Sequence, residues 1–295
     1  MLPSHIDYEN LAGAANPGEL IKRILKLFVS LVVCSCGSLV RTLRAWFGHS
    51  ASRDFVVLYY HLVEMKDRDR FCWQMDYLSK HAQAVPADYK GPFPAGRTPV
   101  AVTFDDAFAS LADTAIPEMA LRGIPFTVFV PTAFIGRPAG WIRYAGNRLP
   151  LPQVMDSSQL QALGRIPDAG IGSHCRSHRR LIELQDPESK EEIKRSKEEL
   201  EEILGRGVNL LSFPHGSYRE NHLVMAREAG YERVFTIEPG RNRESTEFMF
   251  SAGRIRVDPG DWKTEFRLKV SGSYSWMTIA SRIMKRISLR DGCQR

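Results

Sequence analysis

Short apolar runs alternate with longer amphipathic stretches from residue 54 onward. Seven runs of mostly apolar residues predict strands, at 55–59, 100–104, 126–130, 170–173, 210–213, 233–237 and 254–257. Between several of them lie stretches that predict helices, at 71–81, 108–121, 157–163, 187–204 and 220–229. Strands that alternate with helices pair in parallel. The pattern therefore predicts an α/β fold of about seven parallel strands, either an open sheet or a closed barrel.

The chain before residue 54 follows a different pattern. The first 20 residues are polar and mixed, and we expect them to form a leader. An uncharged apolar segment, residues 27–40, is 14 residues long, which is shorter than the roughly 20 residues that span a bilayer. Basic residues flank it on both sides, so charge assigns no orientation. The segment predicts an interfacial helix or a helix docked on the domain, with an uncleaved signal anchor as the alternative.

The C-terminal segment is basic and amphipathic. Over residues 276–287, apolar positions recur at helical spacing, and Arg282, Lys285 and Arg286 lie between them. This pattern predicts a cationic helix that either binds an anionic membrane surface or packs on the outside of the domain. With the apolar N-terminal helix, it leads us to expect peripheral membrane association. The predicted divisions are a leader at 1–53, an α/β domain at 54–270 and a tail at 271–295.

The overall composition is that of an ordinary globular protein. The 295 residues are 43% hydrophobic and 25% charged, with a net charge of +6. Residues 263–295 hold eight basic and two acidic residues, so this segment carries the whole excess. No nucleic-acid recognition motif appears, and we expect no nucleic-acid partner. Five cysteines at irregular spacing do not form a disulfide framework, which favours the cytoplasmic side of a membrane over secretion.

Candidate chemistry lies at the ends of two predicted strands. Asp105 and Asp106 directly follow one strand, and His174 and His178 follow another. The i, i+4 spacing of the histidines would place both imidazoles on one face of a helical turn. In α/β folds, functional groups gather at the C-terminal ends of strands. Two histidines and one carboxylate form a common zinc site with an open position for water, so the sequence predicts one aspartate as a ligand and the other beside that water.

Three short segments resemble a known family. TFDDA (103–107), SHCRSH (173–178) and SFPHGSY (212–218) resemble the first three motifs of the polysaccharide deacetylases, the NodB-like carbohydrate esterases of family four. The resemblance runs from about residue 55 to residue 266. It implies a distorted (β/α) barrel, in agreement with the strand pattern. It also implies a hydrolase that removes N-acetyl or O-acetyl groups from a polysaccharide or its glycan precursor, in exopolysaccharide biosynthesis.

The resemblance also implies roles for the acids and histidines. Asp106, His174 and His178 would hold a divalent metal, usually zinc. Asp105 would be the general base that takes a proton from the metal-bound water, while the metal polarises the acetyl carbonyl.

Two further motifs bear on substrate binding. Pro214, His215 and Gly216 match the third motif, so the backbone N–H of His215 would stabilise the oxyanion, with its side chain a groove residue. DPGDW (258–262) fits the fourth motif, with Trp262 either a wall of the substrate groove or a core residue at a turn.

The general acid is expected at an unusual place. Amide cleavage needs an acid to protonate the leaving amine, but the late Leu-x-His motif of many members is absent. LYYHLVE (58–64) resembles the Tyr-His motif of circularly permuted relatives that deacetylate biofilm poly-N-acetylglucosamine. It makes His61 the general acid, or otherwise an ordinary strand-end histidine. Two departures from the family are Ala107, where a glycine is usual, and Ser212, where many members carry the arginine that orients the base.

Two other functions compete with this one. The first is a non-catalytic glycan-binding barrel, against which the complete set of two aspartates and two histidines argues. The second is a metal amidohydrolase that acts on a non-sugar amide. The loop 136–150 carries Trp141, Arg143 and Tyr144, which could bind a sugar but do not identify one.

Overall fold

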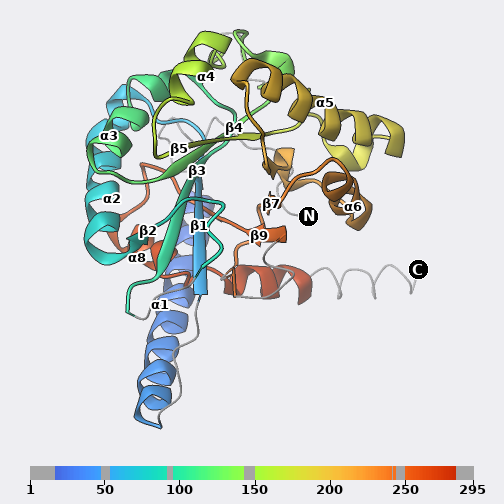
Figure 1. Cartoon of the computed structure of the whole chain (residues 1–295). Coiled ribbons are helices and arrows are strands. Elements are labelled where there is room, and N and C mark those ends of the chain that lie inside the picture. The colour runs from blue at the N-terminus through green and yellow to red at the C-terminus, as the bar shows by residue number, and fades with distance from the viewer. Residues whose placement is uncertain are drawn as a thin grey trace.

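The computed structural model confirms an α/β fold in which helices surround a sheet of mostly parallel strands (Figure 1). It describes residues 17–47, 54–91, 96–142, 150–240, 242–243 and 250–283. The predicted leader up to residue 16, and the tail from residue 284 on, lie outside the described residues.

The sheet follows the order β10-β1-β3-β4-β5-β6-β7-β9, and every neighbouring pair along this path is parallel. Its strands are β1 (Asp54–Tyr60), β3 (Pro99–Phe104), β4 (Phe126–Val130), β5 (Ala169–Ser173), β6 (Leu210–Ser212), β7 (Arg233–Thr236), β9 (Ser251–Gly253) and β10 (Ile255–Arg256). Two short strands lie off this path: β2 (Gln83–Ala84) pairs with β3, and β8 (Asn242–Arg243) pairs antiparallel with β1. All seven predicted strands are present.

One short segment closes the sheet into a nearly complete barrel. β9 and β10 are separated in sequence only by Arg254, yet β9 pairs with β7 and β10 pairs with β1, at opposite ends of the strand order. The stretch from β9 to β10 therefore joins the two edges. The predicted barrel is confirmed, with β9 as an eighth strand that the apolar pattern did not reveal.

The helices are α1 (Pro17–Trp46), α2 (Arg68–His81), α3 (Ala115–Leu121), α4 (Ser157–Leu163), α5 (Asp186–Leu204), α6 (Glu220–Glu228) and α8 (Lys263–Val270). The prediction of one helix over 108–121 is wrong, because a short 3-10 helix, η3 (Ala109–Ala112), precedes α3. Pro117 lies in the first turn of α3, and a proline ring is tolerated there but not in a helix interior. Thr114 lies between the two helices, and its hydroxyl donates a hydrogen bond to the Val63 carbonyl (2.8 Å).

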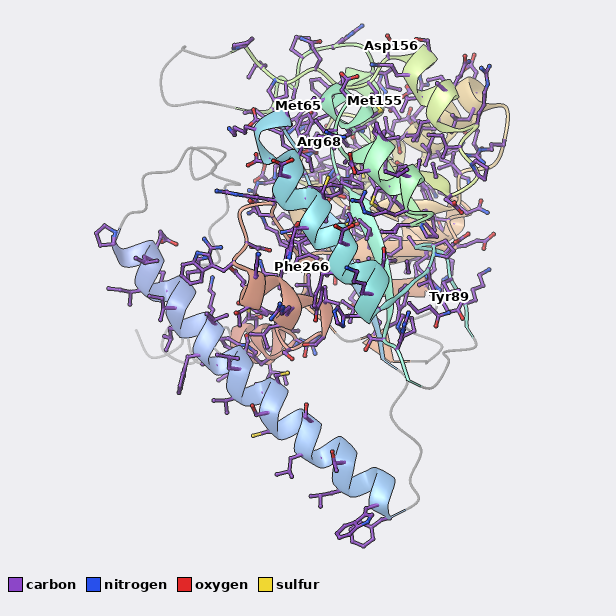
Figure 2. The ribbon with its side chains drawn as sticks, turned by 90° about the vertical axis from the view of Figure 1, so that its left-hand side faces the viewer. Met65, Arg68, Tyr89, Met155, Asp156 and Phe266 are labelled. Atoms are coloured by element: carbon purple, nitrogen blue, oxygen red, sulfur yellow. The ribbon has the colours of Figure 1, made fainter. Side chains whose placement is uncertain are left out.

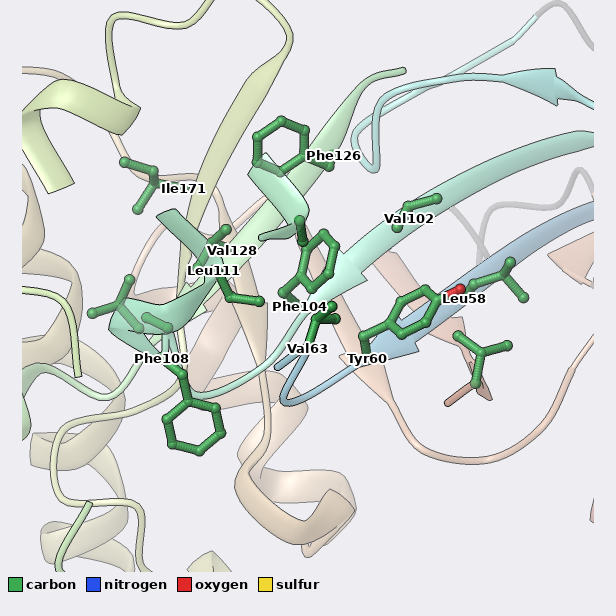
Figure 3. Packing of buried hydrophobic residues seen from close by; sticks show 14 of the residues in the cluster. Leu58, Tyr60, Val63, Val102, Phe104, Phe108, Leu111, Phe126, Val128 and Ile171 are labelled. Atoms are coloured by element: carbon green, nitrogen blue, oxygen red, sulfur yellow. The ribbon is translucent and has the colours of Figure 1, made fainter. Parts of the chain in front are cut away.

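Side chains of the strands pack on two sides of the barrel wall. On the outer side, residues such as Tyr60, Phe104 and Val128 pack beneath the helices (Figure 3). A smaller cluster contains Phe55, Phe129 and Phe235 on the alternate positions, which point inward. A strand buried on both sides needs apolar residues throughout, which explains the continuous apolar runs in the sequence.

The predicted N-terminal apolar helix is present and longer than its uncharged segment. α1 packs against α8 along one side, and Figures 1 and 2 show its C-terminal half extending beyond the rest of the described structure. The segment Pro17–Val40 is long and apolar enough to cross a bilayer, and only 6% of its most apolar window is buried. The helix that contains the uncharged segment is therefore long enough to span a membrane, because it begins well before residue 27.

The predicted C-terminal helix is described only in part. Residues 276–283 are helical, and the indole nitrogen of Trp276 donates a hydrogen bond to the hydroxyl of Ser30 on α1 (2.9 Å). Lys285 and Arg286 lie outside the described residues, so the cationic character of this helix stays a prediction.

Candidate active site

The two adjacent aspartates occupy a tight turn at the C-terminal end of β3. The backbone N–H of Asp105 still bonds to the Tyr60 carbonyl of β1 (2.9 Å), but Asp106 and Ala107 both adopt left-handed backbone conformations, with φ of 72° and 49°. Ala107 thus takes a conformation that favours glycine, the residue usual here in the family. The turn buries both carboxyl groups almost completely.

The two histidines lie in a loop after β5, not on a helical turn as the spacing predicted. Cys175 and His178 both have a φ of 56°, which interrupts any helix. The carboxylate of Glu192 on α5 accepts hydrogen bonds from the backbone N–H groups of Arg176 (3.0 Å) and Ser177 (2.7 Å). The loop therefore takes its shape from α5 and not from local helical bonding.

The structure brings Asp106, His174 and His178 together. One possible ligand atom from each lies within 4.8 Å of the other two, and all three residues are buried. The Nε2 atoms of His178 and His174 lie 3.0 and 3.6 Å from Oδ1 of Asp106. Nδ1 of His174 lies 2.8 Å from the Ser212 carbonyl oxygen, so this nitrogen carries the proton and Nε2 is left for a ligand. This donor set fits a divalent metal such as zinc.

Electrostatics keep this cluster in the protonation state that a metal needs. Burial lowers the pKa of His174 to about 4, so its imidazole is neutral at neutral pH. Burial alone would raise the pKa of Asp106, but the charge and hydrogen bond of His178, with the charges of His61 and His174, hold it well below its usual range. Asp106 is therefore an ionised carboxylate and His174 a neutral imidazole, the forms in which these groups bind a metal.

Asp105 is held by a buried arginine inside the barrel. Nη1 and Nη2 of Arg254 donate hydrogen bonds to the two carboxylate oxygens of Asp105 at 2.7 and 2.8 Å, and Nη2 also donates to the Ser212 hydroxyl (2.7 Å). The guanidinium lies over the ring of Tyr59, 4.6 Å from its centroid. Burial raises the pKa of Asp105, but the charge and hydrogen bonds of Arg254, together with the charges of His174 and His61, outweigh this effect and hold the pKa below its ordinary value. Asp105 is therefore ionised.

Sequence reasoning missed Arg254. An orienting arginine was expected at position 212, where the chain has serine, and the structure supplies the guanidinium from the junction of β9 and β10 instead. Arg254 thus takes the role of the arginine that many family members carry at position 212, and Ser212 accepts a hydrogen bond from it. The available signal was an arginine at the first position of the strand predicted at 254–257.

His61 follows directly after β1 and is half-buried. Burial lowers the pKa of its imidazole by more than the charges of Asp106 and Asp105 raise it, so the pKa of His61 lies below its ordinary value. His61 is therefore close enough to both aspartates for their charges to act on it. The barrel wall explains this proximity, because β1 pairs with β3 and both strands end at the same rim.

The third motif forms a short turn, η6 (Pro214–Gly216), after β6. His215 and Gly216 have φ of 57° and 58°, and a Cβ at Gly216 would lie 2.1 Å from Cγ1 of Ile237, so only glycine fits there. The His215 ring centroid lies 4.6 Å from that of His178. Burial, followed by the charge of His178, lowers the pKa of His215 to about 3. The turn thus places a neutral imidazole against the candidate metal ligands.

Residues 94–234 match the family model described as polysaccharide deacetylase. The match covers just under half of the chain, which thus contains a domain similar to the polysaccharide deacetylases. The chain is 26% identical over 161 residues to the Bacillus subtilis (strain 168) protein named "Putative polysaccharide deacetylase YxkH". That match covers 55% of this chain and 52% of the relative, about half the length of each.

Solved structures share the fold of the deacetylase domain. IcaB from Ammonifex degensii has a TM-score of 0.61 and 22% identity, over 76% of this chain and 98% of its own. The Streptococcus pyogenes deacetylase PplD, solved in complex with acetate, has a TM-score of 0.60 and 19% identity, over 75% of this chain and 99% of its own. At these identities the likeness shows a common fold.

Trp141 packs on a candidate metal ligand of the deacetylase domain. Its ring stacks on His178 with centroids 4.3 Å apart and planes at 21°, and Phe134 lies edge-on to it at 4.6 Å. Its indole nitrogen is buried and has no hydrogen-bond partner among the described residues. The sequence suggested Trp141 only as a sugar-binding residue. Its loop partners Arg143 and Tyr144 lie outside the described residues.

Trp262 and Cys175 do not contact the candidate metal ligands in the way that Trp141 does. Trp262 immediately precedes α8, is 39% exposed, and carries the guanidinium of Arg23 from α1 over its ring at 4.4 Å. Its exposure rules out the core alternative, and its role as a groove wall stays a prediction. Cys175 is fully buried, and burial raises the pKa of its thiol well above the ordinary value, so it is unsuited to act as a nucleophile.

Proposed function

We propose that this chain is a metal-dependent deacetylase that removes N-acetyl or O-acetyl groups from a polysaccharide or its glycan precursor. The observation that carries the proposal is the pairing of two aspartates with different partners at one rim of the barrel. Asp106 faces His174 and His178, while Asp105 is bound to Arg254. One carboxylate is thus available as a ligand and its neighbour as an ionised base.

The residues divide the work of hydrolysis. Asp106, His174 and His178 would hold a divalent metal, zinc by donor type, which would acidify the bound water and polarise the acetyl carbonyl. Asp105 accepts the proton of the attacking water. The backbone N–H of His215, in the turn that Pro214 begins, stabilises the oxyanion. His61 protonates the leaving nitrogen, so the products are acetate and a free amine.

The glycan has room beside this rim. A cavity of about 480 Å³ lies between α1, α2 and α8, and its lining includes Lys26, Arg70 and Arg256. Arg256 lies opposite Tyr59 in the pairing of β10 with β1, two residues before His61, so the cavity extends toward the proposed acid. A sugar chain bound at the rim can therefore extend over polar side chains. A role in exopolysaccharide biosynthesis would suit such a substrate.

The test is acetate release from N-acetylglucosamine oligomers by the purified full chain, with zinc and after chelation. The proposal expects release that chelation abolishes and zinc restores. Asp105→Asn should retain zinc and lose turnover, whereas Asp106→Asn should lose zinc. Zinc binding without any acetate release would favour the glycan-binding barrel, and release from non-sugar amides alone would favour another amidohydrolase.

A further inference from the structure

The two sides of α1 differ in what they contact. Arg23, Leu27, Ser30 and Cys34 recur every three or four residues and form its inner side, against the domain. Arg23 donates hydrogen bonds to the carboxylate of Glu265 (2.8 Å) and to the Gly260 carbonyl (2.9 Å). Ser30 is completely buried and accepts the hydrogen bond of Trp276. These contacts fix which side of α1 faces outward.

The outer side of α1 is apolar and exposed. Its large side chains include Ile21 (66% exposed), Phe28 (63%), Leu25 (61%) and Val32 (47%). At about 100° per residue, the exposed apolar positions run from Leu20 on one flank to Val40 on the other, somewhat more than half the helix circumference. The sequence has no charged residue from Leu27 to Val40. On the same count Glu19 and Lys26 fall toward the inner side, and Lys22 lies on the flank that Val40 marks.

We infer that α1 lies in the interface of a lipid bilayer, with this outer side among the acyl chains and the domain seated on its inner side. A contiguous apolar surface of this extent is rare on a soluble monomer. Pairing with a second copy would use a narrow stripe of two positions per heptad, whereas the exposed face of α1 is about twice that wide. Lipid covers a broad apolar face and leaves the polar side in water.

The contacts of α1 favour this orientation over a membrane-crossing one. Arg23 to Cys34, the part docked on the domain, lies in the middle of the segment that would cross. A crossing helix in this pose would carry Glu265, Asp261 and Lys269 of the domain to membrane depth. These groups form a buried ion-pair network, and charges at that depth are costly. A helix lying in the interface keeps the whole network on the water side.

A neighbouring segment extends the apolar surface. Residues 276–283 are joined to α1 through Trp276, and they expose Ile279 (64%) and Ile283 (52%). Membrane binding by α1 does not depend on the proposed deacetylase activity, so each can fail without the other.

The test is flotation of the full chain with vesicles of phosphatidylcholine and phosphatidylglycerol. The wild type should float, and the triple variant Ile21→Ser, Phe28→Ser, Val32→Ser should lose bound protein at least about tenfold, because three apolar side chains leave lipid. The control Leu121→Ser, Val224→Ser removes exposed apolar side chains of α3 and α6 and should float like the wild type. Thermal unfolding checks that each variant is folded.

Four results would overturn the inference. Wild type that stays at the bottom of the gradient would do so, as would a dimer that only the outer-side variant dissociates. Protein that resists extraction from cell membranes by alkaline carbonate would show a crossing helix. Membrane-bound protein whose N-terminus lies beyond Phe47 would show that α1 is cleaved as a signal sequence. Release by carbonate with α1 intact supports the interfacial position.

Discussion

The guanidinium group of Arg254 binds both carboxylate oxygens of Asp105 from the interior of the barrel, at 2.7 and 2.8 Å. The two residues are 149 positions apart in sequence. Their pairing depends on barrel closure, because Arg254 sits between the strand that pairs with β7 and the strand that pairs with β1. The segment that closes the barrel thus also sets the charge state of the proposed base.

Replacing Arg254 should move the pH dependence of turnover. In Arg254→Met the burial of Asp105 remains but the compensating charge is lost, so the pKa of Asp105 rises. A base acts only when ionised, so the acid limb of the kcat/KM profile should shift to higher pH. Activity at neutral pH should fall about tenfold or more, with zinc retained. Arg254→Lys keeps the charge without the paired hydrogen bonds and should shift the limb less.

Arg233 provides the matched control for this prediction. It is another almost completely buried arginine, but it donates hydrogen bonds to the carbonyls of Ala87 and Tyr89 at the opposite end of the strands. Breaking either buried arginine interaction should cost about 3–5 kcal/mol of stability. Only the Arg254 variants should move the acid limb. Equal shifts in the Arg233→Met and Arg254→Met profiles would refute a specific role for Arg254.

His61 as general acid predicts a dependence on the leaving group. His61→Gln should lower kcat on N-acetylglucosamine oligomers by about a hundredfold or more, because the amine must leave protonated. Acetate release from p-nitrophenyl acetate should change little, since nitrophenolate leaves without a proton. His81→Gln, at the exposed end of α2, is the control. Equal losses on both substrates would mean that His61 supports the site in another way.

Much of the architecture could be predicted because local signals coincide with element ends. The helix predicted at 187–204 is observed at Asp186–Leu204, with a proline in its first turn and Gly205 at φ 63° beyond its end. The strands were found because a wall buried on both sides is apolar at most positions. The i, i+4 histidines misled, because the same spacing occurs in a loop whose shape depends on Glu192 from another element.

The burial of His215 predicts acid sensitivity of the metal-free protein. Its pKa is about 3 when folded and near 6.5 when unfolded, so the unfolded state binds more protons between these values. Stability should therefore fall as pH falls below about 6.5, by at most about 1.4 kcal/mol per pH unit from this residue. His215→Gln should unfold less steeply with acid in chemical denaturation, whereas His81→Gln should run parallel to the wild type. A His215→Gln curve parallel to the wild type would contradict the prediction.

Trp141 should control the orientation of one proposed metal ligand. His174 is oriented by a hydrogen bond to the Ser212 carbonyl, but Nδ1 of His178 is buried without such a partner in the described part of the chain. Packing against Trp141 therefore orients the His178 ring. Loss of groups that orient a metal ligand typically costs 10–100-fold in metal affinity.

Trp141→Leu should weaken zinc binding by about tenfold in competition with a chelating dye. Trp262→Leu removes a tryptophan whose described ring contact is with Arg23, and should leave zinc affinity unchanged. Equal zinc affinity in Trp141→Leu and the wild type would show that the metal alone orients His178.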